Sequence, residues 1–190
     1  AFCVGTDLKS LAVTGDYGVD LYRDALDSVA WLELTDLGFV RYDSRGHGRS
    51  DAPNGPYTID LLADDALGLL DALGIERAHI VGASMGGMIA QVVAARFPHR
   101  VLSLTSIMSS SGNPKVSRSR PHAMRALLSK PSDPNDPDQV VEHLIRLFGV
   151  IGSPDYPSDQ GELRRRIGRG VCRAYHPAGV LQQLLAIIAS

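Results

Sequence analysis

The sequence contains little cysteine and no excess of either charge, and both features restrict the kind of protein it encodes. Its two cysteines, Cys3 and Cys172, lie far apart and match no metal-binding or redox spacing. We interpret them as free thiols in a reducing cytoplasm. The 19 basic and 21 acidic residues leave a formal net charge of −2, so nothing in the composition indicates a nucleic-acid partner.

Long apolar runs are also missing. No stretch approaches the length of a membrane span, and the first twenty residues lack the basic-then-apolar layout of a signal peptide. The composition, 44% hydrophobic and 21% charged, is typical of a soluble globular protein. A length of 190 residues suits one domain, or one core with a small lid.

One short stretch carries the strongest chemical signal in the sequence. Residues 82–86 read Gly-x-Ser-x-Gly, with a short apolar run at 78–81 before them and a helix-forming run at 87–97 after them. This strand–turn–helix context is typical of a nucleophile elbow, a sharp turn that holds a serine hydroxyl clear of the backbone. We therefore predict that Ser84 is a nucleophile held in a strained backbone conformation.

The residues around Ser84 fit the same interpretation. Gly82 and Gly86 lack the Cβ atoms that would collide within such a crowded turn. The helix that follows would direct its free N–H groups and its positive dipole end at an oxyanion formed beside Ser84. An ordinary Gly-rich turn between strand and helix would look similar. A phosphate-binding loop is disfavoured, because the glycine spacing matches neither Gly-x-Gly-x-x-Gly nor Gly-x-x-x-x-Gly-Lys-Ser/Thr. We therefore predict no cofactor.

Residues 1–15 carry no clear pattern, whereas apolar periodicity in residues 17–108 alternates between the strand and helix periods. The predicted strands and helices are 17–21, 26–37, 39–43, 59–73, 78–81, 87–97 and 101–108. This order predicts an α/β fold, a mostly parallel sheet with helices on both faces. Trp31 is expected to pack in the core, and Ser84 would stand at the carboxyl end of its strand, where such sheets bind ligands.

No strand pattern appears after residue 112, so we divide the chain into a core at 1–112 and a helical cap at 113–190. Helical pieces are predicted at 124–128, after Asp136, after Asp159 and at 179–188. The three arginines at 164–166 are expected to form a solvated face, and apolar faces of the cap would line a pocket.

Capping residues mark two of the predicted helix starts. Thr58 is a suitable N-cap, and the helix it begins is expected to end at Gly74. Asp136 is followed by Pro137 at the first helical position and by Gln139 at the third.

His47 lies between two glycines in the loop after the 39–43 strand. A histidine that serves Ser84 needs an orienting carboxylate and a free approach, so we interpret His47 as structural. Asp43 and Arg45 are expected to brace the same loop through hydrogen bonds.

Residues 42–50 (Tyr-Asp-Ser-Arg-Gly-His-Gly-Arg-Ser) and 82–87 (Gly-Ala-Ser-Met-Gly-Gly) together resemble the α/β-hydrolase superfamily. The likeness runs from about residue 37 to residue 112, and residues 175–179 resemble the lid that precedes the family's sixth strand. Within the superfamily, the sequence is similar to esterases, methylesterases, proline-iminopeptidase-like enzymes and cofactor-free haloperoxidases, which share these motifs.

The resemblance implies roles for two residues and exposes one departure. Ser84 would attack an acyl carbonyl, and the N–H of Met85 would be one donor of the oxyanion hole. The family takes its second donor from a His-Gly-type loop after strand three. The stretch 22–39 holds no such loop, so the source of the second donor is left open.

A second departure concerns the acid and the base. In the family an Asp or Glu and then a His follow the cap, each after a strand. His122, His143 and His176 lie within the predicted cap, and none follows a strand. We therefore expect the acid and the histidine beyond residue 190, and residues 1–190 alone to be inactive or weakly active.

These observations predict a serine hydrolase of the α/β-hydrolase fold that acts on a carboxylic ester or related acyl substrate, a small molecule. Two alternatives are left open. One is a cofactor-free haloperoxidase or perhydrolase that uses the same elbow, and the other is a non-catalytic fragment of the fold that binds a small ligand. The oligomeric state is left open too.

Overall fold

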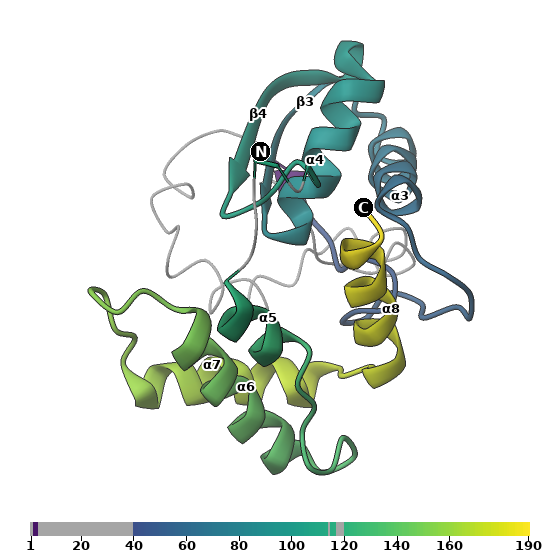
Figure 1. Ribbon diagram of the computed structural model, residues 1–190. Coiled ribbons are helices and arrows are strands. Elements are labelled where there is room, and N and C mark those ends of the chain that lie inside the picture. Colours follow the sequence, from purple (N-terminus) through teal and green to yellow (C-terminus); the bar gives the residue numbers. More distant parts are fainter. Residues whose placement is uncertain (1, 4–39, 114, 117–119) are drawn as a thin grey trace. The chain divides into compact units, whose positions relative to one another are not determined.

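The computed structural model in Figure 1 describes residues 2–3, 40–113, 115–116 and 120–190. The strand predicted at 17–21, the helix predicted at 26–37 and Trp31 lie outside the described residues. The described elements are, in chain order, β1 (Phe2–Cys3), β2 (Val40–Arg41), α3 (Ile59–Ala72), β3 (Ala78–Ala83), α4 (Met85–Arg96), η2 (Pro98–Arg100), β4 (Val101–Ile107), α5 (Pro121–Leu127), α6 (Pro137–Ile151), α7 (Gln160–Arg173) and α8 (Pro177–Ile188).

The strands form one parallel sheet in the order β2-β1-β3-β4. β3 and β4 pair along their whole lengths, from Ala78 opposite Val101 to Ala83 opposite Ile107. The parallel sheet and its helices confirm the predicted α/β class. β1 was not predicted, because two residues are too few to show a period in the sequence.

Local signals at both ends of α3 set its length. The side chain of Thr58 accepts a hydrogen bond from the N–H of Leu61 (3.0 Å), which confirms the predicted N-cap. At the other end Gly74 has a φ of +66°, and the N–H of Ile75 donates to the carbonyl of Leu70 (2.8 Å). These are the features of a Schellman C-cap, in which glycine adopts the left-handed conformation without strain.

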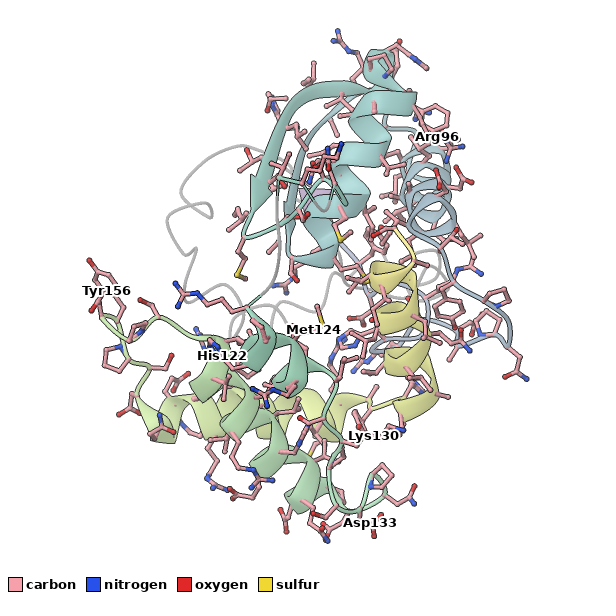
Figure 2. The ribbon with its side chains drawn as sticks, viewed as in Figure 1. Arg96, His122, Met124, Lys130, Asp133 and Tyr156 are labelled. Carbon is pink, nitrogen blue, oxygen red and sulfur yellow. The ribbon has the colours of Figure 1, made fainter. Side chains whose placement is uncertain are left out.

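α4 packs on β3 and β4, and α3 packs against α4 (Figure 1). The apolar faces of α3 and α4 meet in one core with Ile80 from β3. Its fully buried members include Leu62, Leu69, Leu70 and Val93. At the rim of this core Arg96, labelled in Figure 2, forms ion pairs with two exposed carboxylates of α3, Asp60 (2.9 Å) and Asp64 (3.2 Å).

The contacts divide the chain into two compact units, one of residues 1–113 with 178–190 and one of residues 114–177. The sequence-based division placed 178–190 with the cap, whereas the contacts group it with the first unit. Three features of α8 explain this. Gly179 lies against the carbonyl of Gly46, Gln183 donates to the carbonyl of Arg45 (2.9 Å), and Ala186 is buried in the core.

The described part of the second unit consists of helices α5, α6 and α7. Asp136 caps α6 as predicted: its carboxylate accepts from the N–H of Asp138 (3.0 Å) and from the side chain of Gln139 (2.7 Å). The hydrogen bond from Gln139 is the main cause that lowers the pKa of Asp136. On α7 the three arginines pair with Glu142 and Glu162 and stay exposed, as expected of a solvated face.

Replacing Thr58 with alanine is expected to lower the free energy of unfolding by about 1 kcal/mol, because the N–H of Leu61 loses its acceptor. Urea denaturation of the two proteins measures this difference. Thr58→Ser is the matched control, since it keeps the accepting oxygen and should be nearly as stable as the wild type. Equal stability of all three proteins would show that the cap contributes nothing.

Candidate functional site

Ser84 stands at a sharp turn between β3 and α4, as the sequence predicted. Its φ is 52° and its ψ is −120°, a backbone conformation that residues with a Cβ rarely adopt. Its N–H donates to the carbonyl of Ile107 at the end of β4 (3.0 Å), and the residue is exposed. The strain and the exposure together are what a nucleophile elbow requires.

The glycine at position 82 is required by close packing of the backbone. A Cβ at this position would overlap the carbonyl of Gly86 and would lie 2.7 Å from the nitrogen of Gly87. Any side chain at 82 would therefore force the turn apart. Gly87, to which the sequence analysis gave no packing role, is constrained as well, because a Cβ there would lie 2.5 Å from the Cβ of Ser109.

Met85 is the first residue of α4, which therefore begins two residues earlier than the sequence predicted. The first N–H groups of a helix have no partner within it. At this end of α4 the N–H groups of Gly87 (2.9 Å) and Met88 (3.3 Å) both donate to the carbonyl of Ser84. The N–H groups of Met85 and Gly86 are left as the first donors of the helix, next to the exposed serine.

Two polar side chains that sequence reasoning missed hold the elbow against the segment after β4. The hydroxyl of Ser109 donates to the carbonyl of Ser84 (2.8 Å). The amide nitrogen of Gln91 lies within hydrogen-bond distance of the carbonyls of Gly87 (3.1 Å) and Ser110 (3.1 Å). No sequence pattern could have found the contacts of Ser109 with Ser84 and of Gln91 with Ser110, because these residues are brought together by the fold.

The loop after β2 is braced as predicted. The buried carboxylate of Asp43 accepts from the N–H of Arg49 (3.0 Å), and a Cβ on Gly48 would overlap that carboxylate. The guanidinium of Arg45 forms a bidentate salt bridge with the carboxylate of Asp65 on α3 (2.5 and 2.6 Å). The hydrogen bonds that Arg45 donates to Asp65 are the main cause that raises the pKa of its guanidinium.

All six histidines lie in the described part of the chain, and none of them makes a described hydrogen bond to the hydroxyl of Ser84. His79 is five residues before Ser84 on β3, about 16 Å away along the strand, and its Nδ1 lies 2.8 Å from Ser103 Oγ. His47 is an exposed member of the braced loop. His122, on α5 in the second unit, is labelled in Figure 2.

His143 lies on α6 in the second unit. Burial lowers the pKa of His143, and the positive charge of Arg146 lowers it further. Across the described ranges, no cluster of three or more His, Cys, Asp or Glu side chains could hold a metal ion. No helix within those ranges is long and apolar enough to cross a membrane.

Comparison with known proteins gives matches over much of the chain. A family model described as alpha/beta hydrolase fold matches residues 28–147. Rhodomycin D methylesterase DauP of Streptomyces sp. (strain C5) is 34% identical over 150 residues, which cover 67% of this chain and 49% of that protein. 3-Oxoadipate enol-lactonase 2 of Acinetobacter baylyi is 51% identical over 61 residues, which cover 32% of this chain and 23% of that protein.

The chain is also similar to solved structures of hydrolases. The enol-lactonase from Burkholderia xenovorans LB400 superposes with a TM-score of 0.62 at 28% sequence identity, and the match covers 100% of this chain and 65% of that one. The chain spans about half the length of DauP.

Proposed function

Because this chain belongs to the alpha/beta hydrolase fold family, we propose that it carries the nucleophile of a serine hydrolase, Ser84. One observation supports this proposal above all others. Ser84 is an exposed serine with a φ of 52° at the junction of a strand and a helix, beside the first N–H donors of that helix. Strain of this kind persists only where the surrounding structure enforces it, and it is concentrated at functional sites.

The proposed reaction follows from this geometry. The Ser84 oxygen attacks the carbonyl carbon of an ester as a base takes its proton, and the carbonyl oxygen becomes an oxyanion. The N–H of Met85 donates to that oxyanion. Collapse of this tetrahedral intermediate leaves an acyl-enzyme on Ser84 and expels the alcohol, which takes up a proton. Water then attacks the acyl carbon, releases the acid and restores the serine.

An unassisted serine is a poor nucleophile at neutral pH, so the reaction needs a histidine and an orienting carboxylate. No described histidine is hydrogen-bonded to Ser84, and His79 stands at the far end of β3. We propose that the whole protein supplies both groups from sequence outside residues 1–190. The chain covers 49% of DauP, which leaves room for them in a protein of that relative's length.

The substrate class rests on the relatives. They include a methylesterase, an enol-lactonase and proteins named as putative carbamate hydrolases, whose names all point to a carbonyl bonded to oxygen. We propose a small carboxylic ester or lactone. We also propose that the second unit is the helical cap that the sequence analysis expects, and its exposed apolar side chains include Phe148 and Val150.

Steady-state hydrolysis by the whole protein tests this proposal with a short panel: a methyl ester, an aryl acetate and a lactone. We expect turnover of at least one ester or lactone, and little turnover of a peptide bond of similar size. Perhydrolysis, assayed with acetate and peroxide, is expected to be slower than hydrolysis. A protein that turns over none of the panel, or only acetate with peroxide, would contradict the proposed function.

A further inference from the structure

We propose that Ser109 is a positioning residue, which fixes the peptide between Ser84 and Met85 so that the Met85 N–H points at the developing oxyanion. The inference rests on the proposed function and assigns to it a residue outside the Gly-x-Ser-x-Gly motif. It starts from one contact, the hydrogen bond from the Ser109 hydroxyl to the carbonyl oxygen of Ser84 (2.8 Å).

The carbonyl of Ser84 and the N–H of Met85 belong to the same peptide unit. That unit is planar and trans, so its C=O and N–H bonds point in opposite directions. Whatever holds the carbonyl oxygen of Ser84 therefore sets the direction of the Met85 N–H. An engaged carbonyl also makes the N–H of its own peptide a stronger donor, because neighbouring hydrogen bonds polarise one another.

Three donors hold this carbonyl, and Ser109 differs in kind from the other two. The N–H groups of Gly87 and Met88 belong to the first turn of α4 and fix the peptide only relative to its own helix. Ser109 comes from the segment after β4 and joins the peptide to the neighbouring strand. The N–H of Ser84 is anchored outside the helix by the carbonyl of Ile107 (3.0 Å), and Ser109 adds an anchor outside the helix on the carbonyl of this strained residue.

The residues around Ser109 leave room for its hydroxyl to reach the carbonyl of Ser84. Gly87 has no Cβ, and an added one would lie 2.5 Å from the Cβ of Ser109 and 2.7 Å from its hydroxyl oxygen. Only glycine at 87 lets the hydroxyl come close enough. Gln91 holds the adjoining residue, since its amide nitrogen lies 3.1 Å from the carbonyl of Ser110. Gln91 belongs to α4, so its contact with Ser110 ties the segment to that helix, and its contact with the carbonyl of Gly87 (3.1 Å) holds the amide in place within the helix.

The role predicts a specific kinetic effect. The Met85 N–H matters most when the oxyanion forms, so a misdirected N–H weakens the transition state more than the bound substrate. We expect Ser109→Ala to lower kcat by roughly 10- to 100-fold, less than the complete loss of an oxyanion donor, while KM changes little. The affinity for a boronic acid, which forms a tetrahedral anion on the serine, should fall in parallel with kcat.

The experiment compares variants of the whole protein with the ester it hydrolyses best. Ser109→Thr keeps the hydroxyl and should recover most of kcat. Gly87→Ala keeps the hydroxyl but pushes it away, so it should reproduce the loss and serves as a second test if Ser109→Ala folds poorly. Ser111→Ala is the matched control, because its exposed hydroxyl accepts only a long hydrogen bond from the N–H of Asn113 (3.5 Å).

The outcomes separate this inference from the proposed function. Hydrolysis that persists in Ser84→Ala refutes the proposed function, and this inference with it. Hydrolysis that requires Ser84 but is unchanged in both Ser109→Ala and Gly87→Ala refutes only the role of Ser109. A loss in Ser109→Ala that appears in KM rather than kcat, or that Ser109→Thr does not recover, also refutes it.

Discussion

Ser84→Ala is expected to lower kcat of the whole protein for its best ester by roughly 10⁴- to 10⁶-fold, the range seen when the nucleophile of a serine hydrolase is removed. The reason is that the acyl-enzyme cannot form without the hydroxyl, and only binding and the oxyanion donors remain. KM should change little, because the hydroxyl adds little to substrate binding. Single-turnover and steady-state hydrolysis measure both constants.

The backbone of Ser84 supplies a control for this prediction. Its φ of 52° strains alanine as much as serine, so Ser84→Ala should be about as stable as the wild type. Ser84→Gly relieves the strain and should be more stable than Ser84→Ala by about 1 kcal/mol, although it is equally inactive. Ser111→Ala should retain full activity. An active Ser84→Ala protein would place the chemistry on another residue.

Gly82→Ala is the second change with a large expected effect. The added methyl would overlap the carbonyl of Gly86, which is backbone and cannot rotate away. We expect a loss of about 1–3 kcal/mol in the free energy of unfolding, and a fall in kcat of about 100-fold or more as the elbow shifts. Chemical denaturation and ester hydrolysis measure the two effects separately.

Gly68→Ala is the matched control for this glycine. Gly68 lies inside α3, and a Cβ there would meet no atom within 4 Å. Alanine is the better helix former, so Gly68→Ala should be as stable as the wild type or more stable by up to about 1 kcal/mol. If the two glycine variants behaved alike, the crowding at Gly82 would not be the cause of its effect.

The elbow itself could be predicted from the sequence, since each of its requirements is local. Gly82, Ser84 and Gly86 lie within five consecutive positions, and the strand and the helix beside them show clear apolar patterns. The caps at Thr58 and Asp136 were predictable for the same reason. Each is a hydrogen bond between a side chain and a backbone N–H two or three positions later.

Contacts between distant segments could not be predicted in this way. Ser109 and Gln91 look like ordinary polar residues until the fold brings β4 beside the start of α4. The placement of α8 depends on the close approach of Gly179 to Gly46, two glycines 133 positions apart (179 − 46). Neither contact leaves a period or a spacing in the sequence. In each place a glycine allows a close approach, Gly87 to Ser109 and Gly179 to Gly46, and these pairs are recognised only in the folded structure.

The most direct test of the central claim is covalent labelling of the whole protein with a fluorophosphonate probe, followed by peptide mapping of the labelled site. Only an activated serine displaces fluoride from such a probe. We expect one label on the peptide that contains Ser84, its loss in Ser84→Ala and its retention in Ser111→Ala. A protein that takes up no label, or that still takes it up after Ser84→Ala, would contradict the assignment of Ser84 as the nucleophile.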